Sequence, residues 1–176
     1  MEAKSRIAVF LAEFDLQVQQ LTDIYGLLEK RLDAFGRQAQ SVEMVESTGY
    51  WLHNLYCAFE DLFKIIAAFW ENHVINDGGF HANLLKRMRV PIEGMRPAVL
   101  SAQSYASLDE LRGFRHVFRH AYSFGLDDQR VLFLLRRVIE KRDFIIKDLQ
   151  EFRRKIATLG PVTSAGKKKL VKSSSS

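Results

Sequence analysis

Residues 7–35 read IAVFLAEFDLQVQQLTDIYGLLEKRLDAF, and this stretch decides the fold class. Its apolar residues recur with alternating spacings of four and three. They are Ile7, Leu11, Phe14, Val18, Leu21, Tyr25, Leu28, Leu32 and Phe35. A heptad seam about four repeats long predicts a long helix that packs in a bundle or across a dimer. Gly36 follows the seam and is a typical signal for the end of a helix.

The next stretch repeats this helical period with a wider apolar surface. From Ser41 to about Glu71 apolar residues again recur every three or four positions, and Trp51, Tyr56, Phe63 and Trp70 broaden the stripe. A stripe this wide predicts a helix with neighbours on more than one side.

Turn residues then divide the middle of the chain. Residues 76–79 read Asn-Asp-Gly-Gly, which is a strong turn signal. Only a short helix fits at residues 80–88, and the two prolines within residues 90–97 predict a loop because proline disfavours helix at the residue before it.

Two more long helices complete the expected fold. We expect the fourth to begin after Ser107, with Glu110 completing a capping box, and to end within residues 122–125. Asp127 or Asp128 caps the fifth, which stops at residues 160–161, Gly-Pro. No strand pattern is evident. The sequence therefore predicts an all-α bundle of four long helices and one short helix.

Composition supports one globular domain. The chain has 176 residues, of which 47% are hydrophobic and 27% charged, and we expect a domain at residues 1–160 followed by a disordered basic tail at 161–176. Lysines of the tail supply four of the five net positive charges, which leaves +1 for residues 1–166. Overall charge is therefore no reason to expect a polyanion, and any attraction to nucleic acid must be local. Without a long apolar run or a secretory signal, we expect a cytoplasmic protein and no membrane partner.

One segment concentrates cations and titratable groups. Residues 111–122 read LRGFRHVFRHAY. On a helix, the apolar residues of this segment form one face and its polar residues another. The polar residues of interest are Arg115, His116, Arg119, His120 and Tyr122. One face is expected to pack in the core, and the other to present chemistry.

Arg115, His120 and Tyr122 form the pattern Arg-x4-His-x-Tyr, late in a helix and ahead of a loop and a final long helix. This arrangement resembles the HEPN superfamily, and most closely its HepT-like toxins. The resemblance implies a HEPN-type antiparallel helical bundle that forms a homodimer, in which motifs from two subunits line one cleft. It also implies an endoribonuclease that cleaves RNA without a metal or other cofactor.

The chemistry of RNA cleavage explains why these residue types suit the reaction. Attack of a 2′-hydroxyl on the adjacent phosphate needs proton carriers and positive charge for the phosphorane. We expect Arg115 to stabilise the phosphate, His120 to transfer protons, and His116 and Arg119 to bind RNA. Positions 115 and 120 lie about 140° apart on a straight helix, so either the helix distorts or a second subunit completes the site. By resemblance alone, Tyr122 is the residue to which a nucleotidyltransferase antitoxin of the MNT type adds AMP.

Other interpretations remain open at this stage. His116 and His120 have the spacing of a metal-binding pair, but no third ligand is evident. Glu60 pairs with Lys64 on the surface in the favoured interpretation, although Glu60 or Asp61 could instead orient an arginine. The side chains expected to be structural or at the surface are His53, His73, His81 and Cys57. The alternative function is a non-catalytic helical subunit that binds and regulates a nucleotidyltransferase.

Overall fold

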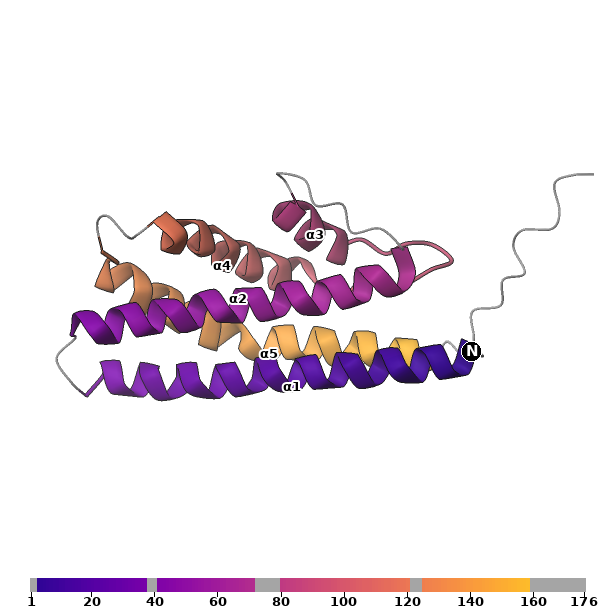
Figure 1. Cartoon of the computed structure of the whole chain (residues 1–176), viewed down its shortest axis with the longest axis horizontal. Coiled ribbons are helices and arrows are strands. Elements are labelled where there is room, and N and C mark those ends of the chain that lie inside the picture. Colours follow the sequence, from indigo (N-terminus) through magenta and orange to yellow (C-terminus); the bar gives the residue numbers. More distant parts are fainter. Residues whose placement is uncertain (1–2, 38–40, 72–79, 121–124, 159–176) are drawn as a thin grey trace, which may run out of the picture.

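A computed structural model describes residues 3–37, 41–71, 80–120 and 125–158 of the chain (Figure 1). This part of the chain contains five α-helices and no strand. Their bounds are α1 Ala3–Phe35, α2 Val42–Glu71, α3 Phe80–Met88, α4 Ala102–His120 and α5 Asp128–Thr158. The structure thus confirms the predicted all-α bundle of four long helices and one short helix. None of these helices is long and apolar enough to cross a membrane.

α2 is the central helix of the bundle. It packs against each of the other four helices, whereas α1 packs only against α2 and α5, and α3 only against α2 and α4. Figure 1 shows α1, α2, α4 and α5 running alternately in opposite directions, with α3 beside α2 and α4. The many neighbours of α2 account for the wide apolar stripe in its sequence.

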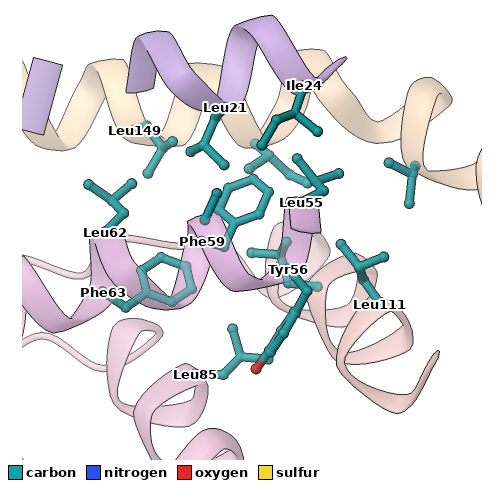
Figure 2. Packing of buried hydrophobic residues seen from close by; sticks show 14 of the residues in the cluster. Leu21, Ile24, Leu55, Tyr56, Phe59, Leu62, Phe63, Leu85, Leu111 and Leu149 are labelled. Carbon is teal, nitrogen blue, oxygen red and sulfur yellow. The ribbon is translucent and has the colours of Figure 1, made fainter. Parts of the chain in front are cut away.

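The core runs along the whole bundle. Figure 2 shows its middle, where Leu21 of α1, Phe59 of α2 and Leu149 of α5 lie together and are fully buried. Burying a side chain of this size stabilises the fold by about 1.5–3 kcal/mol. At one end of the bundle Phe10 packs edge-on against Trp70, and the ring centroids are 4.7 Å apart. The heptad seam of α1 therefore faces the core, as its spacing predicts.

Polar side chains cap the starts of two helices, and the cap of α5 is one of the two that the sequence predicts. The Ser41 hydroxyl accepts a hydrogen bond from the Met44 amide (3.3 Å), which caps α2. The Asp127 carboxylate accepts one from the Arg130 amide (2.9 Å), which caps α5. Each bond satisfies an amide that has no partner within its helix.

The start predicted for α4 is wrong. The helix begins at Ala102, and the hydroxyl of Ser101 caps it by accepting a hydrogen bond from the Ser104 amide (3.2 Å). Asp148 of α5 holds this cap in place by accepting a hydrogen bond from the Ser101 amide (2.7 Å). Ser107 lies inside the helix, where its hydroxyl donates to the carbonyl of Gln103 (3.2 Å). A contact with a distant helix therefore decides which serine is the cap.

The predicted loop between α3 and α4 is fixed by a buried arginine. The guanidinium of Arg96 is fully buried and donates to the carboxylate of Glu71 at 2.7 and 3.0 Å. It also donates to the backbone carbonyls of Arg87, Val90 and Pro97. These bonds join the end of α2, the end of α3 and the loop, and so position α4 relative to α2.

Several predictions fall on residues that the structure does not describe. They are the turn at 76–79, the role of His73, the end of the fourth helix beyond His120, the end of the fifth helix at 160–161, and the tail at 161–176. The division into a domain at 1–160 and a disordered tail stays a prediction.

Candidate active site

Polar side chains line the contact between α2 and α4. On each helix they are spaced by three or four residues, which places them on one face of that helix. The set on α2 is His53 and Cys57, and the set on α4 is Arg112, Arg115 and Arg119. The two helices pack side by side, and Arg115 acts electrostatically on both members of the α2 set, while Arg119 acts on His53.

Arg115 lies at the edge of this contact. Its side chain is half-buried, and it acts electrostatically on the thiol of Cys57 on α2. Its Nε is buried and has no partner within the described part of the chain. The neighbouring Leu111 and Phe114 are buried in the core. Arg115 is thus held between α2 and α4 and does not extend freely from an outer face.

His53 is a residue of α2 on which the charges of both Arg115 and Arg119 act. Its ring stacks on that of Phe118, with centroids 5.2 Å apart and an angle of 20° between the planes. Its Nε2 lies 3.6 Å from Sγ of Cys57, and its Nδ1 is buried without a partner in the described residues. Burial lowers the pKa of His53, and the positive charges of Arg115 and Arg119 lower it further. The imidazole is therefore neutral at pH 7.

Two more groups on α2 are held in their neutral form. Burial raises the pKa of the Cys57 thiol, and the favourable interaction with Arg115 only partly opposes this effect. Burial also raises the pKa of the Tyr56 hydroxyl well above its ordinary value. Neither group provides an anionic nucleophile at neutral pH, since a thiolate or phenolate is required for that role.

The positive charges of α4 differ in their partners. Arg112 forms an ion pair with Asp109 at 2.7 Å. Neither Arg115 nor Arg119 forms an ion pair with a carboxylate within the described part of the chain. Arg119 and His116 are both exposed. His116 lies one helical turn after Arg112. Arg115 and Arg119 lie one turn apart and remain available to bind an anion such as a phosphate.

The structure describes the other motif residues only in part. His120 is the last residue of α4, and its side chain lies outside the described residues, as does all of Tyr122. The backbone of α4 is regular from Arg115 to His120. The two positions therefore keep the separation of about 140° around the helix that regular geometry requires.

The comparison with known families agrees with this architecture. A model of the HepT-like protein family matches residues 47–156, which is more than half of the chain. The chain belongs to the HepT-like family. The matched range runs from α2 to α5 and contains all residues of the site described above, whereas α1 precedes it. No curated protein and no solved structure matches the chain.

One prediction for this HepT-like chain is wrong. Lys64 pairs with Asp61 at 2.9 Å and not with Glu60. Glu60 is only 4% exposed, and its carboxylate accepts a hydrogen bond from Nδ1 of His81 on α3. The reason is that α3 covers the face of α2 on which Glu60 lies. His81 consequently has a structural role.

Sequence reasoning also missed His53 and Cys57 as neighbours of the motif arginine. Residues 53 and 57 are spaced by four on α2, as are 115 and 119 on α4, but spacing within one helix does not state which faces of two helices meet. Among the residues whose side chains are described, no group of three or more histidines, cysteines or carboxylates could hold a metal ion.

Proposed function

We propose that this HepT-like chain is a metal-independent endoribonuclease that cleaves RNA at the interface of a homodimer. The observation that supports it best is the state of Arg115 and Arg119. They lie one turn apart beside α2, and neither has a carboxylate partner in the described residues. Arginines in this state suit the phosphodiester backbone, because each guanidinium can donate two parallel hydrogen bonds to phosphate oxygens.

In the proposed reaction the 2′-hydroxyl of RNA attacks the adjacent phosphorus and the 5′-oxygen leaves. Arg115 stabilises the charge that develops on the phosphorane, and His120 carries a proton, which suits an imidazole with an ordinary pKa of about 6.5. Arg119 and His116 bind the flanking RNA backbone. The products are a 2′,3′-cyclic phosphate and a free 5′-hydroxyl.

The proposed dimer follows from the regular backbone of α4. Positions 115 and 120 point about 140° apart around one helix, so a single copy of α4 does not direct both at one phosphate. A second copy brings a second pair, and the arginine of one subunit then acts with the histidine of the other.

Neutralisation of the nuclease is proposed from family resemblance. A nucleotidyltransferase antitoxin transfers AMP to the hydroxyl of Tyr122, which adds a bulky anion beside the cationic site. The added charge repels RNA, and the adenylate group fills the space that RNA needs.

The first experiment measures cleavage of a labelled single-stranded RNA in the presence of a chelator. We expect cleavage to persist and to leave 2′,3′-cyclic phosphate ends. Arg115→Ala is expected to slow it roughly a hundredfold or more, and His120→Ala by a similar factor. Arg136→Ala is the matched control, since Arg136 is an exposed arginine on α5. Unchanged cleavage in both site variants would refute the assignment.

A second experiment tests the shared site. Differently tagged Arg115→Ala and His120→Ala subunits are co-expressed and the mixed dimer is isolated. If each site takes its arginine from one subunit and its histidine from the other, the mixed dimer contains one site in which both are intact. It should then recover part of the activity that each variant lacks. A site contained within one subunit regains none.

The partner is tested by co-expression with a nucleotidyltransferase and measurement of intact mass. Addition of one adenylate to the wild-type chain, and none to Tyr122→Phe, supports the proposed modification. If the chain binds this partner tightly but neither the wild type nor any variant cleaves RNA, the chain is instead a non-catalytic regulatory subunit.

A further inference from the structure

His53 lies beside the two arginines that the proposed function assigns to phosphate. Phe118, against which His53 stacks, is the residue before Arg119 on α4. Cys57, whose sulfur lies 3.6 Å from the His53 ring nitrogen, is itself a group on which the charge of Arg115 acts. The imidazole therefore has two contacts near the arginines. One is to Phe118, next to Arg119 in the chain, and the other is to Cys57, on which Arg115 acts.

We propose that His53 is a further residue of the RNA site, and that it takes up a proton when an RNA phosphate binds beside Arg115 and Arg119. This inference rests on the proposed function for the identity of the ligand. In the free protein the site holds two arginine charges and a neutral His53. In the complex it holds three cations against the phosphodiester.

The physical reason is the balance of charge around the ring. Arg115 and Arg119 on α4 are the charged groups that act on His53, and Cys57 is the titratable group that it contacts on its own helix. No carboxylate in the described part of the chain acts on His53. The two positive charges disfavour a third, which keeps the pKa of His53 below its ordinary value.

A bound phosphate changes this balance. Its negative charge offsets the arginines, so the pKa of His53 rises, and a proton is taken from solvent. By linkage, protonation of His53 and phosphate binding must favour each other by the same factor. Each unit by which the pKa rises makes binding tenfold tighter at a pH below both values than at a pH above both.

Nitrogen-15 NMR of the histidine rings tests this directly. The probe is a short single-stranded 2′-deoxyoligonucleotide, which carries the phosphates but cannot be cleaved by 2′-hydroxyl attack. His53→Gln identifies the signal of His53. We expect the pKa of His53 to rise when the oligonucleotide is added at saturating concentration.

The matched control is the double variant Arg115→Ala, Arg119→Ala. Without its two arginine neighbours, His53 should have a higher pKa in the free protein than in the wild type, and the oligonucleotide should leave that value unchanged. Affinity measured between pH 5 and pH 8 should rise toward acid in the wild type and rise less in His53→Gln. His116 and His120 are followed separately by their own ring signals.

The possible outcomes distinguish a failure of this inference from a failure of the nuclease proposal. If the oligonucleotide binds and the pKa of His53 stays constant, the inference is overturned and the nuclease proposal is untouched. If the pKa rises but RNA is never cleaved, His53 belongs to a nucleic-acid site that is not catalytic. If the oligonucleotide does not bind at any pH, the inference is overturned, whereas the nuclease proposal is decided by the RNA cleavage assay.

Discussion

Nδ1 of His81 on α3 donates a hydrogen bond to the carboxylate of Glu60 on α2. The carboxylate is almost fully buried, whereas the His81 side chain is 39% exposed. This bond ties the short helix to the central one next to the contact between α2 and α4. A buried carboxylate needs such a partner, because an unsatisfied charged acceptor is costly.

Loss of this partner should destabilise the fold. We expect His81→Ala to lower the free energy of unfolding by about 1–3 kcal/mol, measured by urea denaturation. The control is Asp61→Ala, which removes only the exposed pair with Lys64 and should cost less than about 1 kcal/mol. In Glu60→Gln the cost of His81→Ala should shrink. Equal costs in both backgrounds would show that the bond contributes nothing.

Removal of Arg96 should be more damaging. Arg96→Ala breaks the buried pair with Glu71 and leaves three backbone carbonyls without a donor, so we expect a loss of about 3–5 kcal/mol. Arg96→Lys should recover little, because an ammonium cannot reproduce the planar fork. Arg154→Ala, which removes an exposed pair with Glu151, is the control and should change stability by less than about 1 kcal/mol. Thermal or urea unfolding followed by circular dichroism measures all three.

Two glycines within helices should respond differently to alanine. A Cβ at Gly26 has nothing within 4 Å, so Gly26→Ala should stabilise the fold by roughly 0.5–1 kcal/mol. A Cβ at Gly49 would lie 2.5 Å from Leu126 Cδ1 and 3.3 Å from the Phe118 ring. Leu126 must then move, and the cost of this movement offsets the stability that alanine gains over glycine within a helix. Gly49→Val adds further atoms there and should lower the melting temperature. A stabilising Gly49→Val would contradict this packing.

Acidification should destabilise the protein through His53. Its pKa is lowered in the folded state, so below about pH 6.5 the unfolded chain binds a proton that the folded chain resists. Stability contributed by the neutral ring is present above pH 6.5 and is lost as pH falls through the folded pKa. The measurement is the free energy of unfolding from pH 5 to pH 8. The free energy of unfolding should decline less toward acid in His53→Gln than in the wild type. An equal decline in both proteins would show that the pKa of His53 is not lowered in the folded state.

The helices could be predicted because their signals are local. The heptad seam of residues 7–35 needs only the periodicity of one segment, and the predicted cap Asp127 bonds to an amide three residues away. The start of α4 was missed for the opposite reason. The sequence predicts a cap at Ser107, whereas the cap is Ser101, which Asp148, 47 residues away, holds in place.

The residues of the candidate site likewise divide into those that the sequence predicts and those that depend on tertiary packing. The motif residues Arg115, His116, Arg119, His120 and Tyr122 were found from their spacing, and the HepT-like family from their context. The burial of Glu60 could not be predicted, since it depends on α3 packing over α2. The position of His53 and Cys57 beside Arg115 could not be predicted either, because no periodicity states which faces of two helices meet.

The sequence by itself determined the helical class, the number of helices and the cationic segment near the end of α4, since helix formation follows the spacing of apolar residues within one segment. Only the tertiary structure decided which polar groups meet between α2 and α4. That decision depends on how helices far apart in the chain bury their apolar faces. The same packing holds Arg115 half-buried against Cys57 and keeps His53 neutral.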